Sequence, residues 1–246
     1  MNKKRESFIF GIRPVIEAIK SGKEMERIHL QKNMRGENFR ELFNLIRELN
    51  IPFQFVPVEK LNRLSKQNHQ GVIAWVTEIT YQKIENILPA IYEEGKIPLI
   101  LFLDNITDVR NVGAIARTAE CAGVDAIVIP VRGSAMINSE AIKTSAGALY
   151  KVPVCRTTKP GATIEFLKNS GLQILAATEK GSKEYTEADL MKPSALILGS
   201  EGKGVSAEVM KLADKQINIP LKGEIESLNV SVTAGILLFE TIRQRK

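Results

Sequence analysis

The chain has 246 residues, 44% apolar and 25% charged, a composition typical of a folded protein with one large or two small domains. Lysine and arginine outnumber aspartate and glutamate by 34 to 28, and the net charge of +6 mildly favours a polyanionic partner. The two cysteines, Cys121 and Cys155, have neither metal-ligand nor disulfide-framework spacing, so we expect no metal and a reducing, cytoplasmic setting. No apolar run is long enough for a membrane span, so no membrane partner is expected.

The first 78 residues alternate short strands with helices. The patterns predict strands at Phe8–Phe10, 27–30, Phe53–Val56 and Val72–Val76, and helices near Pro14, at 39–49 and at Val58–Leu64. This alternation predicts a compact α/β domain. His29 lies in a strand and is expected to be structural, whereas His69, close to Gly71, is expected to form a turn or to contact the polyanionic partner.

Residues 79–97 contain few large apolar side chains. They are predicted to form a linker with one short helix, whose Leu88 and Ile91 pack lightly. Beyond it, six apolar strands are predicted near Leu99, Ala126, Val152, Ile174, Leu196 and Ile217. Helical or glycine-bearing segments separate these strands, which predicts a mainly parallel sheet covered on both faces.

Three stretches of this second half combine a strand, a polar loop and a helix. The first, residues 101–123, reads LFLDNITDVRNVGAIARTAECAG. Its strand ends at Asp104, and a helix is predicted to begin near Asn111, with Ile115 and Ala119 on its buried side. Arg117 lies within that helix, where an isolated arginine usually faces solvent or joins a salt bridge.

The second stretch, residues 195–206, reads ALILGSEGKGVS. A strand leads into a glycine loop, and Ser206 is placed to cap a helix running through Leu212, an arrangement that favours a polar or anionic ligand. Val205 stands where a Walker loop needs lysine. Gly202, Gly204 and Ala207 formally fit a dinucleotide fingerprint, but that motif normally opens the first βα unit of its domain.

The third stretch, residues 217–239, reads INIPLKGEIESLNVSVTAGILLF. A short strand ends at Pro220, a polar loop follows, and three-to-four spacing predicts a helix that is apolar around most of its girth. Ser227 and Asn229 stand where short polar side chains cap a helix N-terminus.

In this order and at this separation, the stretches DNITDVRNVGAIARTA, LGSEGKGVS and IPLKGEIESLNVSVTAGILLFE resemble the three motifs of the SpoU, or TrmH-type, RNA ribose 2′-O-methyltransferases. The resemblance covers the chain from about Leu99 to its end. It implies an α/β fold: a ribosomal protein L30e-like RNA-binding domain at residues 1–78, a linker at 79–97, and a catalytic SPOUT domain with a deep trefoil knot at 98–246.

The resemblance also implies that S-adenosylmethionine is the methyl donor, held between the second and third stretches. Gly199, Ile219 and Leu228 match the family's positions for backbone contact with the donor. Four more residues are expected there by their proximity in sequence: Leu198, Gly202, Pro220 and Asn229.

Transfer of a methyl group to a ribose hydroxyl requires that the hydroxyl be oriented and lose its proton. The matching positions make Arg117 the candidate catalytic residue, supported by Asn111, Glu201, Ser227 and Asn229. A guanidinium stays protonated in proteins, so we expect Arg117 to grip the target's phosphate and polarise the hydroxyl. Glu201 and Asn229 would then hold the geometry of the site.

Within the family, the layout is most similar to members that methylate a guanosine of bacterial 23S ribosomal RNA, so that RNA and a second copy of the chain are the expected partners. Transfer RNA methyltransferases and antibiotic-resistance ribosomal RNA methyltransferases share the same motifs. A catalytically silent RNA-binding protein is a further alternative, although a silent relative is expected to have lost one of the catalytic candidates. A nucleotide-dependent enzyme would bind a dinucleotide and no S-adenosylmethionine.

Overall fold

The computed structural model describes residues 8–246, and its chain divides into two units. The first unit comprises Met1–Thr80 with Met136–Ser139, and the second comprises Tyr81–Ala135 with Glu140–Lys246. The first 78 residues of the sequence carry basic side chains that we expect to contact RNA phosphates. Three of them, Lys3, Lys4 and Arg5, lie outside the described residues. No helix in the described part of the chain is long and apolar enough to span a membrane.

The first unit is a four-stranded mixed sheet with three helices. Its elements are β1 (Phe8–Phe10), α1 (Ile12–Lys20), β2 (Met25–Gln31), α2 (Glu37–Glu48), β3 (Phe53–Val56), α3 (Val58–Leu64) and β4 (Val72–Val76). The strand order is β1-β4-β2-β3, in which β2 and β3 run parallel and the other neighbours run antiparallel. The predicted strands are confirmed, although β2 is longer than expected at both ends.

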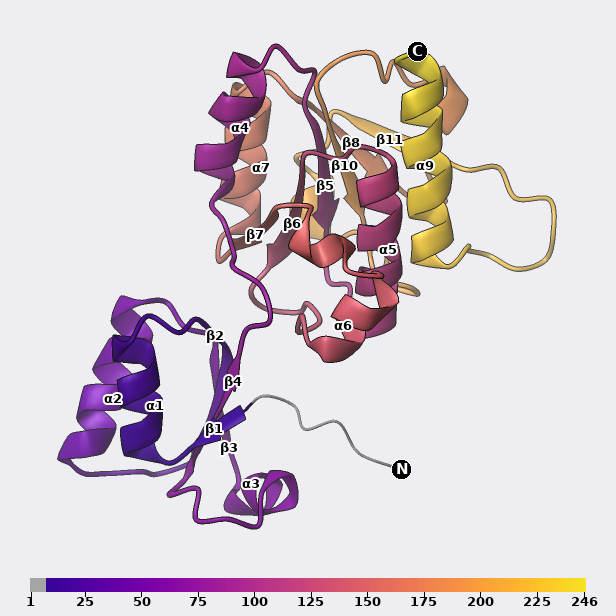
Figure 1. Cartoon of the computed structure of the whole chain (residues 1–246). Helices are drawn as coiled ribbons and strands as arrows, with labels where there is room; N and C mark the ends of the chain where they lie inside the picture. The colour runs from indigo at the N-terminus through magenta and orange to yellow at the C-terminus, as the bar shows by residue number, and fades with distance from the viewer. Residues whose placement is uncertain (1–7) are drawn as a thin grey trace. The chain divides into compact units, whose positions relative to one another are not determined.

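Helices α1 and α2 cover one face of this sheet and α3 lies at the other (Figure 1). The larger core lies under α1 and α2, because both helices turn an apolar stripe towards the strands. A smaller cluster of Val56, Leu61, Ile73 and Trp75 fills the opposite face, and Met136 packs against it. The buried carboxylate of Glu26 accepts a hydrogen bond from the Ile137 N–H, which joins the segment Met136–Ser139 to this unit.

The second unit contains a seven-stranded sheet in which all neighbours run parallel. Its strands are β5 (Leu99–Leu103), β6 (Ala126–Pro130), β7 (Val154–Thr157), β8 (Gln173–Ala177), β9 (Lys183–Glu184), β10 (Ser194–Leu198) and β11 (Lys215–Asn218), in the order β7-β6-β5-β10-β8-β11-β9. The predicted parallel sheet is confirmed. The count of six strands was wrong because β9 has only two residues and therefore no apolar period.

Helices cover both faces of the parallel sheet. They are α4 (Ile84–Glu93), α5 (Val109–Cys121), α6 (Ser139–Thr144), α7 (Pro160–Asn169), α8 (Ala207–Met210) and α9 (Val230–Gln244), with 3-10 turns η1 (Ala148–Tyr150) and η2 (Tyr185–Glu187). Helices α4 and α7 lie on one face, and α5 and α9 lie side by side on the other (Figure 1). The trefoil knot expected from the resemblance stays a prediction.

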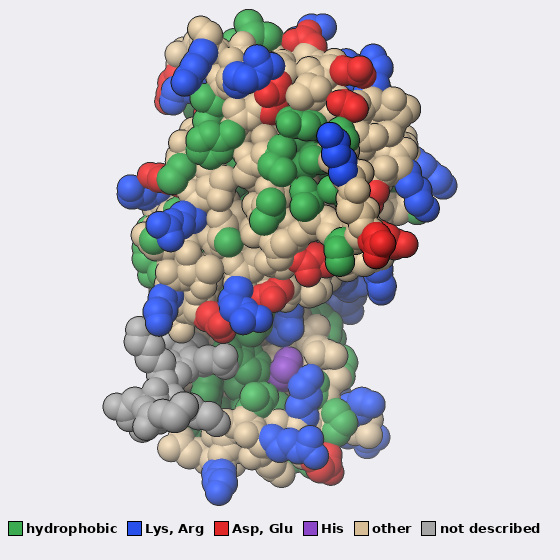
Figure 2. Space-filling model, turned by 90° about the vertical axis from the view of Figure 1, so that its right-hand side faces the viewer, with side chains coloured by type: hydrophobic (Ala, Val, Ile, Leu, Met, Phe, Trp, Pro, Cys, Tyr) green, Lys and Arg blue, Asp and Glu red, His purple; other side chains and the backbone are tan. Residues whose placement is uncertain are grey.

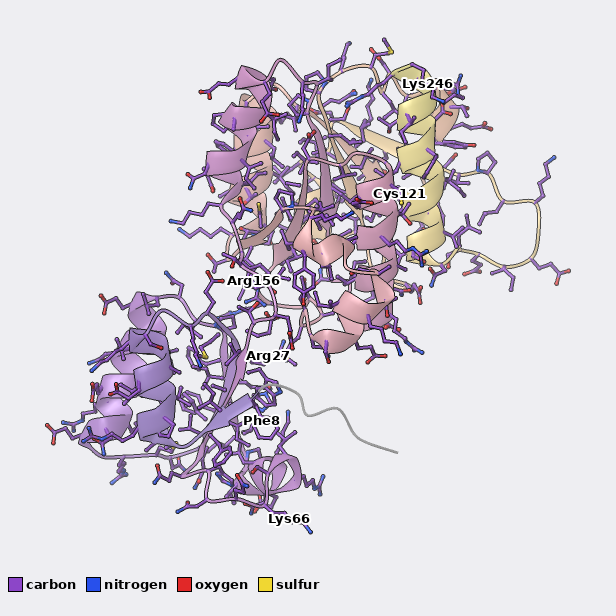
Figure 3. All side chains as sticks on the ribbon, in the orientation of Figure 1. Phe8, Arg27, Lys66, Cys121, Arg156 and Lys246 are labelled. Atoms are coloured by element: carbon purple, nitrogen blue, oxygen red, sulfur yellow. The ribbon has the colours of Figure 1, made fainter. Side chains whose placement is uncertain are left out.

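Three local expectations need correction. The helix predicted in the linker is α4, and its Leu88 and Ile91 do not pack lightly, because both are buried in the core of the second unit. Arg156 of β7, labelled in Figure 3, stacks over the ring of Tyr81 at 3.9 Å and fixes the start of this unit on the sheet. Helix α8 ends at Met210, so it does not reach Leu212, and the Ser206 side chain makes no capping hydrogen bond.

Candidate active site

The loops that follow β5, β10 and β11 meet at one edge of the sheet, because the carboxyl ends of parallel strands lie on the same side. Asp104, just beyond β5, is buried and connects two of these loops. Its N–H donates to the Leu198 carbonyl at 2.8 Å, and its Oδ2 accepts from the Ser206 N–H at 2.6 Å. The sequence marked Asp104 only as the end of a strand.

The loop after β10 is a tight turn that only glycine can form at its first position. Ser200 and Gly204 exchange two backbone hydrogen bonds, of 3.1 and 2.9 Å. A Cβ placed on Gly199 would lie 2.0 Å from the carbonyl carbon of Gly204, far inside van der Waals contact. Gly202 and Gly204 both have left-handed backbone conformations, with φ of +83° and +65°.

A polar cluster joins the three stretches that the sequence singled out. The Nδ2 of Asn111 donates to Glu201 Oε1 at 3.1 Å, and the Nδ2 of Asn229 donates to the same oxygen at 2.6 Å. Asn229 Nδ2 also lies 3.1 Å from Asn111 Oδ1. We call Asn111, Glu201 and Asn229 the amide–carboxylate cluster. Its members lie 28 to 118 residues apart in the chain and come from the N-terminal ends of α5 and α9 and from the glycine loop.

Asn229 has a second role as the N-cap of α9. Its Oδ1 accepts from the Ser231 N–H at 2.9 Å, which satisfies one of the unpaired amides at the helix start. The capping that the sequence suggested for this residue is therefore confirmed. One side chain both begins the helix and binds Glu201, so the position of the helix and the geometry of the cluster depend on each other.

The structure does not bring Arg117 into this cluster. Arg117 lies on α5 six residues after Asn111, about 9 Å further along the helix axis, and its side chain is exposed. Among residues 8–246 it makes no hydrogen bond or ion pair. Ser227, also exposed, lies at the neighbouring cleft. Arg117 is therefore free to contact a ligand.

A cleft of about 660 Å³, counting its open mouth, lies between the glycine loop and the third stretch. Five of the predicted donor-binding residues line it: Leu198, Gly199, Gly202, Ile219 and Leu228. Glu201 and Ser227, predicted as catalytic residues, line it too. Pro220 and Asn229 are not among its lining residues within the described chain, because Asn229 turns towards the cluster and the N-terminus of α9.

One wall of the cleft is formed by residues that no sequence motif indicated. Ala177, Thr178 and Glu179 line it from the end of β8, and Thr233 and Leu237 line it from α9. Strand β8 was predicted, but its place between β10 and β11 was not. A parallel sheet exposes strand ends at one edge, so the strand order would have identified this wall.

The chemistry of the cleft suits a cationic ligand that has a flat apolar part. Ile217, Leu228 and Leu237 supply apolar surface, and the glycine loop presents backbone without side chains. The charged side chains among its lining residues in the described chain are the carboxylates of Glu179 and Glu201. S-Adenosylmethionine, with an adenine ring, a sulfonium and an ammonium, matches this combination of surfaces.

Comparison with known proteins gives the family. The SpoU rRNA Methylase family matches residues 98–239, and a module described as RNA 2′-O ribose methyltransferase substrate binding matches residues 8–82. A Staphylococcus saprophyticus protein assigned by name to the TrmH family of tRNA/rRNA methyltransferases is 36% identical over 98% of this chain and 96% of its own length.

Two solved structures are similar across nearly the whole chain. AviRb, a SpoU methyltransferase from Streptomyces viridochromogenes, is 22% identical, with a TM-score of 0.61, over 97% of this chain and 89% of its own. A structure named RNA 2′-O ribose methyltransferase is 26% identical, with a TM-score of 0.56, over 97% of this chain and 88% of its own. The chain therefore belongs to the SpoU family of RNA 2′-O-ribose methyltransferases and carries the family's substrate-binding module ahead of the methyltransferase region.

Proposed function

We propose that this protein uses S-adenosylmethionine to methylate the ribose 2′-hydroxyl of a guanosine in 23S ribosomal RNA, in the cytoplasm and as a homodimer. The observation that carries the chemistry is the amide–carboxylate cluster, whose Glu201 also lines the cleft. The substrate-binding module at residues 8–82 supports an RNA as the target. One AviRb structure was solved with the cofactor AdoMet, which supports S-adenosylmethionine as the methyl donor.

Residues of the cleft would hold the donor in a bent conformation. Gly199 leaves the backbone of the loop bare, and Ile219 and Leu228 bring the third stretch to the opposite side. The carboxylates of Glu179 and Glu201 attract the positive end of the ligand. Bound there, S-adenosylmethionine supplies an electrophilic methyl group that the ribose oxygen can attack in line.

The amide–carboxylate cluster would fix the geometry of the acceptor. Two amide groups donate to one oxygen of Glu201, so the carboxylate is held in place and its second oxygen can accept from the ribose hydroxyl. Ser227 lies at the same cleft and can position the sugar. The exposed guanidinium of Arg117 remains charged and is suited to bind the phosphate next to the target ribose.

This division of roles separates donor binding from turnover. Gly199→Val is expected to abolish binding of S-adenosylmethionine by calorimetry, because its side chain would collide with Gly204. Arg117→Ala should bind the donor within about twofold of wild type and lose at least about 100-fold in kcat. Arg117→Lys keeps the positive charge but not the planar guanidinium, so its kcat should lie between those of Arg117→Ala and wild type. Equal loss of donor binding in all three variants would contradict the division.

The target is tested by mapping 2′-O-methyl groups on ribosomal and transfer RNA from a strain that lacks the gene. The proposal expects one guanosine of 23S RNA to lose its mark and to regain it when the purified protein and S-adenosylmethionine are added. Loss of a transfer RNA mark with ribosomal RNA unchanged would reject 23S RNA as the substrate. No change in either RNA would reject the activity.

A further inference from the structure

Four phenylalanines gather on the first unit, at the margin of its larger core. Phe39 and Phe43 lie on α2, and Phe53 and Phe55 lie on β3, the strand at the edge of the four-stranded sheet. Phe43 is the centre of the group, with ring centroids 5.7 Å from Phe39, 5.4 Å from Phe53 and 6.0 Å from Phe55. We call these four residues the aromatic cluster.

The two phenylalanines on β3 are more exposed than the two on α2. Phe39 and Phe43 are half-buried and pack against the larger core, as expected for the apolar side of an amphipathic helix. Phe53 and Phe55 are 39% and 42% exposed and belong to neither buried core of this unit. Residues two apart on a strand share a face, so the two rings form one adjoining aromatic surface.

Positive charge borders this surface. The guanidinium carbon of Arg47 lies 5.9 Å from the centre of the Phe43 ring. At about 100° per residue, Arg40 and Arg47 fall within about 60° of Phe43 around α2, and both are exposed. Among the described residues neither arginine makes an ion pair. Lys32 is also close, because its N–H donates to the Val56 carbonyl at the end of β3.

Negative charge on α2 lies on a different side. Glu37, Glu41 and Glu48 fall about 120° to 160° from Phe43 around the helix axis, and Glu41 pairs with Lys20 at 2.7 Å. The exposed face of α2 is therefore divided, with arginines beside the rings and carboxylates away from them. This division complements a polyanion whose apolar parts contact the phenylalanines.

We propose that the aromatic cluster binds the bases of a single-stranded segment of the RNA substrate, with Arg40 and Arg47 on its phosphates. The inference rests on the proposed function for the presence of RNA. Unpaired bases offer flat apolar faces that stack on phenylalanine, whereas a duplex encloses those faces. Rings make no base-specific hydrogen bonds, so the surface accepts any base sequence and selects for single-stranded character.

The test uses the full-length protein and two fluorescent probes, a 12-nucleotide single-stranded RNA and the blunt duplex that it forms with its complement. The double variant Phe53→Leu, Phe55→Leu keeps the apolar surface and removes both ring faces. It should weaken binding of the single strand about 10- to 100-fold and change binding of the duplex less than about threefold. Leu64→Ala, at an exposed apolar position outside the cluster, is the matched control and should leave both affinities unchanged.

A second double variant, Arg40→Gln with Arg47→Gln, tests the phosphate contacts. It should reduce the slope of log affinity against log salt for the single strand by about 1 to 2. The inference is overturned if wild type and the phenylalanine variant bind the single strand with equal affinity. It is also overturned if the phenylalanine variant loses as much affinity for the duplex as for the single strand. A change in oligomeric state with RNA affinity intact would identify a protein interface and also overturn it.

The outcome is independent of methyl transfer. Wild-type protein that binds the single strand through the cluster but methylates no RNA would reject the proposed function and leave this surface assigned. Protein that methylates 23S RNA normally with both phenylalanines replaced, and binds the single strand unchanged, would reject only the inference drawn from the cluster.

Discussion

The Asn229 side chain both caps α9 and donates a hydrogen bond to Glu201, and substitution can separate these two contacts. Asn229→Asp keeps an oxygen that caps α9, where the helix dipole favours negative charge, but it sets a second carboxylate against Glu201. We expect the free energy of unfolding of the aspartate variant to lie within about 0.5 kcal/mol of the wild-type value, and its kcat to fall about 100-fold.

Asn229→Ala removes both contacts. Its kcat should fall about as much as that of Asn229→Asp, and its free energy of unfolding, measured with denaturant, should also fall by about 1 kcal/mol. If the two variants are equally stable, the cap contributes nothing. If the aspartate variant retains full kcat, the hydrogen bond to Glu201 is not needed for the reaction.

His29 makes the first unit sensitive to mild acid. It is 6% exposed, packs edge-on against Trp75 with ring centroids 4.7 Å apart, and has no hydrogen-bond partner for either nitrogen among the described residues. Burial, with the nearby charges of Lys60 and Arg27, lowers the pKa of His29 to about 4. The folded protein therefore resists protonation that the unfolded chain accepts at about pH 6.5.

The sign of the pH dependence follows from this difference. The unfolded state binds more protons between pH 6.5 and 4, so stability is complete above pH 6.5 and falls as the pH decreases through that window. At pH 5 the loss should be about 2 kcal/mol relative to pH 7.5. Denaturant unfolding of His29→Leu should show a smaller loss over the same range. A parallel fall in wild type and variant would assign the effect to other groups.

At the scale of elements, Arg245 fixes the end of α9 to the rest of the second unit. Its guanidinium donates to the carbonyls of Leu190, Ile97, Pro98 and Lys192 at 2.7 to 3.2 Å. These carbonyls belong to segments that precede β5 and β10, so one side chain connects them at the sheet edge opposite the candidate active site. Lysine cannot reproduce this planar fork.

Arg245→Lys should therefore lower the free energy of unfolding by about 2 to 3 kcal/mol, as measured by urea unfolding, because most of the four carbonyls lose their donor. Lys246→Ala, at the exposed neighbouring position, is the control and should change it by less than about 0.5 kcal/mol. A similar small effect for both variants would show that water replaces the guanidinium without loss.

The local patterns predicted most of these elements because strand and helix periods are properties of short stretches. β1, β3, β4 and α3 have the predicted bounds. β9 and the end of α8 were missed because two- and four-residue elements contain too few residues for a period. Leu88 and Ile91 were predicted to pack lightly because a sequence of mixed polarity does not show which helix face a sheet will cover.

The candidate site also contains residues that local patterns indicated and residues that they did not. Each motif was visible along the chain, and Asn111, Glu201 and Asn229 do meet. Glu179 and Thr233 were missed, because their place in the cleft depends on the order of β10, β8 and β11, and on α9 crossing that edge. No local pattern encodes a strand order, which is decided by contacts distant in sequence.

At the scale of the whole molecule, α9 leaves apolar surface uncovered. Its Leu237 and Leu238 are buried, but Val232 and Phe239 are 49% and 53% exposed. Figure 2 shows apolar side chains gathered on the face formed by α9 and the loop before it. Contiguous exposed patches of this kind usually mark an interface. We therefore predict that two copies associate through this helix.

Light scattering at micromolar concentration should give about 55 kDa, twice the 27.3 kDa of the chain. The variant Val232→Lys, Phe239→Lys should be a folded monomer, because lysine on this patch places like charges at the centre of the contact. Val131→Lys, on the loop after β6, provides a control for added charge. A wild-type monomer would refute the prediction, and a dimer unaffected by the two lysines would place the interface elsewhere.

The division of labour between the two units leads to the last prediction. A fragment that begins at Tyr81 retains the cleft, the amide–carboxylate cluster and the core of the parallel sheet. It lacks the first unit, against which Met136 packs and to which Ile137 donates a hydrogen bond. The segment Met136–Ser139 should therefore exchange its amide protons faster in the fragment, while the parallel sheet stays protected. We expect the fragment to fold and to bind S-adenosylmethionine with unchanged affinity by calorimetry.

The fragment should methylate its RNA poorly, because basic residues of the first unit, among them Arg13, Lys32, Arg35 and Arg40, are expected to contact phosphates. Its dissociation constant for RNA should rise and depend less steeply on salt, since fewer counterions are released on binding. For the full chain carrying Arg35→Gln and Arg40→Gln, the dissociation constant and its salt dependence should lie between those of the fragment and wild type. If the fragment methylates RNA at the full rate with the wild-type salt slope, the methyltransferase unit alone selects the substrate, and the first 78 residues do not have the role proposed for them.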